Sequence, residues 1–135
     1  MTTPITLPFD TLALSQAPTV RAPDGSTVHV LLRLAGGSMA HFSLQAGQVS
    51  QAVVHRTVEE LWYIVAGAGQ MWRSQGDQAE VVDLHPGVCL SIPVGTCFQF
   101  RAASDQALAA VAVTLPPWPG DGEALPVTGP WTAQM

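Results

Sequence analysis

The apolar residues of this chain occur in short runs separated by glycine, proline, aspartate or serine. Runs of about four to eight residues that are rich in β-branched and aromatic side chains are typical of β-strands. We expect eight or nine strands, at residues 27–34, 39–44, 49–55, 60–66, 70–73, 79–83, 88–92, 97–101 and 107–115. No segment keeps a helical apolar stripe for three turns, and residues 104–114 alternate as a strand does. The pattern predicts an all-β sandwich or barrel.

The C-terminal segment differs from the rest of the chain in its proline content. Residues 116–130 read PPWPGDGEALPVTGP and contain five prolines. Proline has no amide hydrogen to donate, so this segment cannot add strands to a sheet interior. We expect an extended tail at 116–135 that packs on the barrel through Trp118 and Trp131. The 135 residues contain no linker, which predicts a single domain, 1–135, with the barrel at about 27–115.

Composition and charge limit the classes of partner. The chain is 47% hydrophobic but only 11% charged, so part of the apolar residues is expected in a subunit interface or a pocket. The net charge is −5 and the five basic residues are scattered arginines, which argues against binding to nucleic acid. No apolar run approaches the roughly 20 residues that span a bilayer, and the N-terminus lacks a signal-peptide pattern. We therefore expect a cytoplasmic homo-oligomer with no membrane or nucleic-acid partner.

Two groups of residues, each bounded or begun by glycine, have a spacing that matches a known pair of motifs. The groups are Gly47, Val53, His55, Glu60 and Gly67, then Gly87, Pro93, Gly95, Phe98 and Ala102. This spacing resembles the two motifs of the cupins, G(X)5HXH(X)4E(X)6G and G(X)5PXG(X)2H(X)3N, with every glycine and the proline in register. The resemblance implies a small single-domain protein with a double-stranded β-helix, a jelly-roll barrel, which in similar small cupins pairs as a dimer.

The glycines and the proline of these motifs also have a physical role in turns. Gly67 and Gly69 are expected to supply positive φ angles for a hairpin turn. Pro93 and Gly95 are expected to form a tight turn that directs the following strand.

The cupin resemblance also implies a metal site, which is incomplete in this chain. Cupins typically bind iron, manganese, nickel or zinc with three histidines and one glutamate. By position, the four ligands fall on Val53, His55, Glu60 and Phe98. Valine and phenylalanine cannot donate a lone pair to a metal. The metal motif is therefore degenerate, and a divalent metal (Fe, Mn, Zn or Ni) held by His55 and Glu60 is expected to be weak or absent.

Two other side chains are candidates to replace the missing ligands. Cys97 precedes position 98, and a shift of the strand by one residue would turn its thiolate inward, where it would suit zinc or iron. His41 shares a strand face with Met39 and Ser43, opposite Phe42. If that face lines the barrel, His41 approaches His55.

His55 and Glu60 are also a candidate pair for proton transfer. They are five positions apart, so they share a face only if the chain bends between them. Burial of such a pair perturbs both pKa values. One group can then remove a proton and the other return it, which suits isomerases, lyases and cyclases. The residues expected to line the pocket around the pair are Val53, Trp62, Phe98, His41 and Cys97.

Three functions remain open from the sequence. The leading hypothesis is an enzyme that uses His55 and Glu60 for proton transfer on an apolar or aromatic small molecule. The first alternative is a metal-dependent, dioxygenase-like cupin with an incomplete ligand set. The second is a cupin that binds or senses a ligand without catalysis. Resemblance to the cupins implies a pocket but not a reaction.

Overall fold

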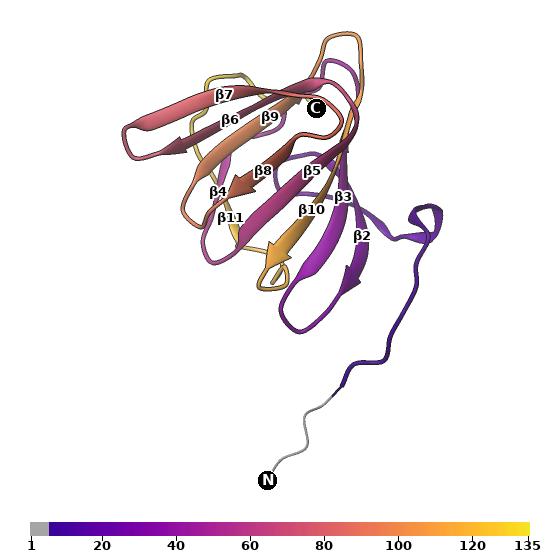
Figure 1. The fold of residues 1–135 in the computed structure, drawn as a ribbon. Coiled ribbons are helices and arrows are strands. Elements are labelled where there is room, and N and C mark those ends of the chain that lie inside the picture. Colours follow the sequence, from indigo (N-terminus) through magenta and orange to yellow (C-terminus); the bar gives the residue numbers. More distant parts are fainter. Residues whose placement is uncertain (1–5) are drawn as a thin grey trace.

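The computed structural model describes residues 6–135, and these residues form a barrel of two antiparallel sheets (Figure 1). One sheet has the strand order β1-β2-β3-β10-β5-β8 and the other β11-β4-β9-β6-β7. A short 3₁₀ turn, η1 (Leu14–Gln16), precedes the strands. The strands are β1 (Thr19–Arg21), β2 (Thr27–Arg33), β3 (Ser38–Leu44), β4 (Val53–His55), β5 (Glu59–Gly67), β6 (Gly69–Gln75), β7 (Gln78–Leu84), β8 (Cys89–Ile92), β9 (Cys97–Ala102), β10 (Leu108–Leu115) and β11 (Ala124–Pro126).

The all-β jelly-roll expectation is confirmed. Residues 6–135 contain no α-helix, and none of their helical segments is long and apolar enough to cross a bilayer. β5 shows why the sequence forms strands, because buried and exposed residues alternate along it from Glu59 to Val65. The inward side chains of both sheets, among them Trp62, Phe98 and Phe100, pack into one core cluster.

Turn glycines fix how the strands connect, although Gly69 does so differently from our expectation. Gly67 has a φ of 82°, and a Cβ there would lie 1.7 Å from the carbonyl oxygen of Ala107. Gly69 does not have a positive φ. A Cβ at Gly69 would instead lie 2.1 Å from the carbonyl oxygen of Arg101, so close approach of a neighbouring strand requires glycine there. Gly95, with a φ of 80°, lies in the expected tight turn.

The main differences from the predicted strands are at the edges of the two sheets. The run at 49–55 forms regular strand only over Val53–His55. β1 and β11 were not predicted, and each has only three residues. β11 lies in the proline-rich tail and pairs with β4 at the sheet edge, where a proline such as Pro126 is tolerated.

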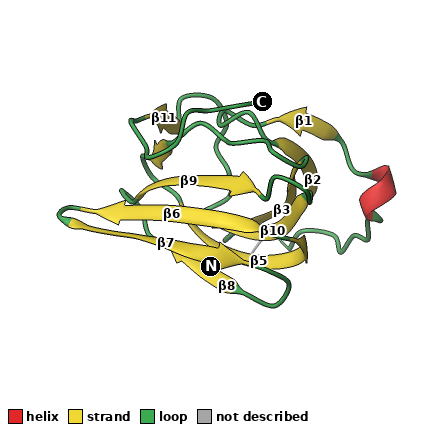
Figure 2. Cartoon of the chain, turned by 90° about the horizontal axis from the view of Figure 1, so that it is seen from above, coloured by secondary structure: helices red, strands yellow, loops and turns green. Residues whose placement is uncertain are grey.

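The two unpredicted strands lie beside a cavity between the sheets. In the view from above, β11, the C-terminus and β1 lie along one side of the barrel (Figure 2). Val20 and Arg21 of β1 and Ala124 of β11 line that cavity. Further along the tail, Trp131 exchanges backbone hydrogen bonds with the Gln99 side chain at 2.8 and 3.2 Å. The barrel and its tail thus build the cavity together.

Candidate functional site

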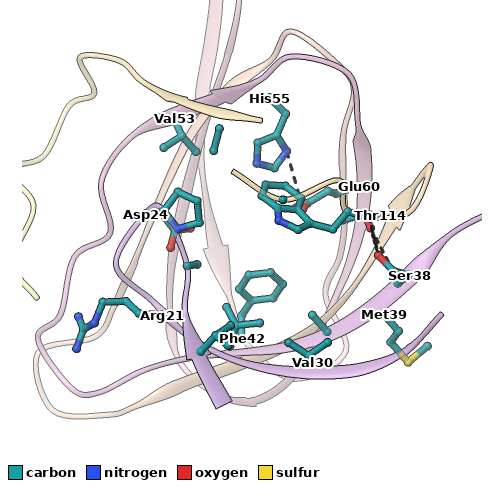
Figure 3. A pocket seen from close by; sticks show the side chains of 18 of the residues that line it. Arg21, Asp24, Val30, Ser38, Met39, Phe42, Val53, His55, Glu60 and Thr114 are labelled. Atoms are coloured by element: carbon teal, nitrogen blue, oxygen red, sulfur yellow. Dashed lines mark hydrogen bonds and ion pairs between the residues drawn. The ribbon is translucent and has the colours of Figure 1, made fainter. Parts of the chain in front are cut away.

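A cavity of about 380 Å³ lies between the two sheets (Figure 3). Its volume is in the range of about 300–1,000 Å³ that is common for small-molecule sites. Most of its lining is apolar and comes from both sheets, for example Val28, Phe42 and Phe98. The buried polar side chains that reach it are few, which makes them the candidates for chemistry and for orienting a ligand.

Five of the residues expected at the pocket line this cavity. They are Val53, His55, Glu60, Trp62 and Phe98. Val53 and Phe98 are directly paired across β4 and β9, and both are buried. The two positions at which cupins usually carry histidines are therefore apolar walls of the cavity.

His41 and Cys97, which we also expected at the pocket, do not line the cavity. On β3 the lining residues are Ser38, Met39, Ala40 and Phe42. His41 is paired with Val111, and Val111 with the exposed Tyr63, so strand register places His41 on the outer face of the sheet. Its ring lies 5.6 Å from that of His29 on the neighbouring strand. Cys97 is half-buried and adjoins the inward-facing Phe98, because β9 pairs with β4 without the one-residue shift that would turn Cys97 inward.

A sharp bend between β4 and β5 brings His55 and Glu60 to the same cavity, as their odd spacing requires. The carboxylate of Glu123, from the C-terminal tail, caps this bend. It accepts hydrogen bonds from the Thr57 amide at 2.6 Å, the Thr57 hydroxyl at 2.8 Å and the Val58 amide at 2.8 Å. The Arg56 amide donates to the Glu123 carbonyl oxygen at 3.0 Å. The tail therefore fixes the geometry of the pair.

Glu123 is itself a buried charged group. Burial raises the pKa of its carboxyl, but the hydrogen bonds from Thr57 and Val58 and the nearby His55 outweigh burial and hold the pKa below its ordinary value. Nothing in the sequence marks Glu123 as a partner of the bend, because it lies far along the chain in an irregular segment.

The His55 and Glu60 side chains face each other at a distance too long for a hydrogen bond. His55 Nδ1 lies 3.9 Å from Glu60 Oε1, and it is buried without a hydrogen-bond partner among residues 6–135. The other carboxyl oxygen, Glu60 Oε2, accepts a hydrogen bond of 2.6 Å from the indole Nε1 of Trp62. The imidazole is held edge-on by Phe98 and Trp118, with ring centroids 5.1 Å away in both cases.

Burial shifts the pKa of each group in the direction that favours its neutral form. It raises the pKa of Glu60 to about 7, an effect that the Trp62 hydrogen bond opposes and the Asp24 carboxyl reinforces. Burial also lowers the pKa of His55 to about 4, and Glu123 only partly offsets this. Although the two groups lie within 4 Å, they are not an ion pair at neutral pH. They are a neutral imidazole beside a carboxyl that is half-ionised near pH 7.

Three further polar residues that are buried or half-buried line the cavity and were not recognised from the sequence: Asp24, Ser38 and Thr114. Asp24 accepts hydrogen bonds from the Ser26 amide at 2.9 Å and hydroxyl at 2.6 Å, and burial raises the pKa of its carboxyl. The Ser38 and Thr114 hydroxyls are hydrogen-bonded to each other. The turn at 22–25 was the only sequence signal near Asp24, and the two hydroxyls lie on strands far apart in sequence.

Sequence comparison identifies the family. The cupin domain family matches residues 40–114, more than half of the chain. The chain belongs to the cupins. No curated protein matches this cupin in sequence.

Solved structures share the fold of this cupin at low sequence identity. KdgF from Halomonas sp. superposes with a TM-score of 0.71 at 14% identity, covering 83% of this chain and 97% of that one. PAC13 from Streptomyces, solved with uridine, gives 0.69 at 12% identity, with coverage of 87% and 90%. Oxalate decarboxylase from Bacillus subtilis gives 0.73 at 12% identity, covering 86% of this chain but only 31% of its own. Identities this low show the fold alone.

The donor set of this cupin does not fit the family's usual metal centre. That centre needs three histidines and a glutamate, whereas the cavity offers His55 and Glu60 with Val53 and Phe98 at the other two positions. Within residues 6–135, no three histidine, cysteine, aspartate or glutamate side chains converge in a group able to hold a metal ion. The replacements that we considered, His41 and Cys97, lie outside the cavity. The side chains present are better suited to proton transfer than to four-ligand coordination.

Proposed function

We propose that this cupin is a small-molecule enzyme in which Glu60 and His55 move a proton within the barrel cavity, in an isomerase, lyase or cyclase type of reaction. The observation that carries this proposal is the burial of Glu60 on the cavity wall, which places its pKa at about 7. A general acid or base is most effective when its pKa lies near the operating pH, because both protonation states are then populated.

The simplest reaction of this kind is an isomerisation next to a carbonyl group. The ionised Glu60 carboxylate takes a proton from the carbon beside the carbonyl, and the electrons of the broken C–H bond move toward the carbonyl oxygen to form an enolate. Where a C=C bond adjoins that carbon, the enolate extends over it, and return of the proton at the far end of the C=C bond moves the double bond into conjugation with the carbonyl without a further reactant. The apolar lining holds the carbon skeleton and keeps water from the enolate.

His55 is suited to act as the second group of the pair. Its imidazole is neutral at neutral pH and so carries one N–H donor and one acceptor nitrogen. Nδ1 is buried without a partner and faces Glu60 at 3.9 Å, so a ligand atom between the two groups would contact both. His55 and Glu60 therefore meet the ligand from the same side, and His55 can receive or return a proton at an atom next to the one that Glu60 contacts.

An exchange experiment in D2O tests this function without knowledge of the substrate. A pool of cellular small metabolites is incubated with the protein, and loss of ¹H NMR signals at carbons next to carbonyl groups is followed. We expect the wild-type protein to exchange specific signals and Glu60→Gln to slow this exchange by about 100-fold or more, the usual contribution of a general base. Glu59→Gln, which changes the exposed neighbouring carboxylate, is the matched control and should exchange normally.

Equal exchange rates for Glu60→Gln and the wild-type protein would contradict the proton-transfer function. The main competing function is ligand binding without catalysis, which the apolar Val53 and Phe98 at former ligand positions favour. In that case the metabolite signals broaden or shift on binding, but no deuterium is incorporated by any variant. The similar structures do not decide between these functions, because their likeness is one of fold.

A further inference from the structure

Three polar side chains form a row across neighbouring strands on one wall of the cavity. Ser38 of β3 is paired with Thr114 of β10, and Thr114 is paired in turn with Glu60 of β5. All three side chains line the cavity, and Figure 3 shows them following one another along the same side. Directly paired residues on antiparallel strands have Cβ atoms about 5 Å apart, so Thr114 and Glu60 are immediate neighbours on the cavity wall.

The hydrogen bonds of this row leave one hydroxyl hydrogen for a ligand. Ser38 Oγ accepts a hydrogen bond of 2.9 Å from the Trp118 amide. One of the two hydroxyl hydrogens is shared between Ser38 and Thr114. The other has no better acceptor than the Ser38 carbonyl oxygen, at 3.5 Å from Thr114 Oγ1, which is the limit for a hydrogen bond. A ligand oxygen beside Glu60 would be the stronger acceptor.

The charges around the cavity disfavour an anionic group at that position. The buried carboxyls are Glu60 and Asp24, and a ligand carboxylate next to them would be repelled in an environment of low polarity. The cationic side chains in the lining are Arg21 and Arg33, and both are exposed to solvent. Arg21 donates to the Gly25 carbonyl oxygen at 3.2 Å, and Figure 3 shows it directed away from Glu60. No buried cation is therefore available in the lining to neutralise a carboxylate.

We propose that the cavity selects an uncharged ligand with an apolar body and a carbonyl oxygen, and that this oxygen accepts its hydrogen bond from the Ser38–Thr114 hydroxyl pair beside Glu60. The assignment rests on the proposed function for the role of Glu60 in turnover, but ligand selection itself can be measured without turnover. The hydroxyl pair then stabilises the charge that develops on the carbonyl oxygen when Glu60 removes the neighbouring proton.

Three ring compounds of similar size distinguish the contributions of the apolar body, the carbonyl oxygen and a negative charge to binding. Acetophenone carries the carbonyl, ethylbenzene has the same body without oxygen, and benzoate replaces the ketone by a carboxylate. Binding is followed at pH 7.5 through the indole N–H signal of Trp62, which bonds Glu60 at the cavity wall and is assigned with Trp62→Phe. The variant is Thr114→Val, which removes a hydroxyl with little change in volume. Thr96→Val, at a buried threonine outside this cavity, is the matched control.

We expect acetophenone to bind more tightly than both ethylbenzene and benzoate. Thr114→Val should weaken the binding of acetophenone by roughly three- to tenfold, the contribution of one hydrogen bond, and leave the affinity for ethylbenzene unchanged. Thr96→Val should change the affinity for neither compound. The proposal is overturned if benzoate binds as tightly as acetophenone, if Thr114→Val does not reduce the preference for acetophenone over ethylbenzene, or if no probe shifts the Trp62 signal. None of these results depends on the exchange experiment, so the failure of ligand selection and the failure of catalysis are distinguishable.

Discussion

At the scale of single residues, burial in one cavity makes a carboxyl and an imidazole respond oppositely to pH. The pKa of Glu60 is raised from 4.5 to about 7, so the folded protein holds a proton there that the unfolded chain releases. The pKa of His55 is lowered from 6.5 to about 4, so the unfolded chain binds a proton there that the folded protein excludes. Stability depends on pH through such differences in bound protons.

The contributions of Glu60 and His55 to the pH dependence of stability should largely cancel in the wild-type protein. Each should become visible in a variant that lacks the other group. Glu60 stabilises the fold below pH 4.5, and this contribution is lost as the pH rises to about 7. His55 contributes stability above pH 6.5, which is lost as the pH falls to about 4. We therefore expect stability to rise with pH between about 4 and 6.5 in Glu60→Gln, and to fall between about 4.5 and 7 in His55→Phe. Each change should be on the order of 3 kcal/mol.

Urea unfolding of the three proteins between pH 4 and pH 7.5 measures these slopes. Asp24 and Glu123 are present in all three proteins, so their contributions cancel in the differences except for the coupling of Asp24 to Glu60 and of Glu123 to His55. Parallel pH profiles for the two variants would show that the Glu60 and His55 pKa values are not shifted by burial as described.

At the scale of elements, the bend between β4 and β5 depends on a side chain from outside both strands. Amides at a tight bend cannot bond within a sheet, and here they donate to the Glu123 carboxylate. Hydrogen bonds to a charged acceptor contribute about 1.5–3 kcal/mol, more than neutral ones. Glu123 therefore acts as a positioning residue, because it holds the bend that brings Glu60 to His55 but does not itself line the cavity.

Replacing Glu123 by glutamine should loosen the bend and also change the chemistry of His55. We expect Glu123→Gln to lower the free energy of unfolding by about 1–3 kcal/mol. The same change should lower the imidazole pKa of His55 further, because the negative charge that raises it is removed. NMR titration of His55 measures this shift, which a purely structural role would not produce. Asp121→Asn, an exposed acid in the same tail, is the control, and an equal effect from it would contradict a specific role for Glu123.

The elements also show what the sequence could and could not predict. All nine central strands were predicted within a few residues, because apolar alternation and turn residues act locally. β1 and β11 have three residues each, too few to show a pattern. The prediction that His41 lines the pocket is wrong, because apolar residues occur on both faces of β3 and the alternation of polarity there does not mark the inner face. The row of Ser38, Thr114 and Glu60 depends on strand register, which no single segment contains.

At the scale of the whole molecule, the six-stranded sheet has an apolar outer face. Strand register places Met39, Val113 and Leu61 in one row across β3, β10 and β5, with Val111 and Tyr63 beside His41 in the next row. Met39, Leu61 and Tyr63 are 41%, 50% and 52% exposed. An antiparallel sheet that faces water usually carries polar side chains on that side. A largely apolar face of this kind supports the expected homodimer, in which a second copy covers it.

A charge in this face should therefore separate the dimer. We expect sedimentation velocity to show a dimer for the wild-type protein and a monomer for Leu61→Asp, because pairing would bury the new carboxylate without a partner. Val81→Asp changes a similarly exposed side chain on β7 of the other sheet and should remain dimeric. A monomeric wild-type protein, or dissociation by Val81→Asp alone, would contradict pairing through the six-stranded sheet.

The position of Glu123 in the chain sets the order in which the site can be completed during synthesis. A ribosome releases the segments of β4, β5 and β10 before it reaches residue 123, so a nascent chain contains His55 and Glu60 before it contains the cap of the bend between them. Protease cleavage in the tail would expose the same reliance of the bend on Glu123. Cutting before Glu123 would leave the central strands intact but remove the group that holds the bend between His55 and Glu60.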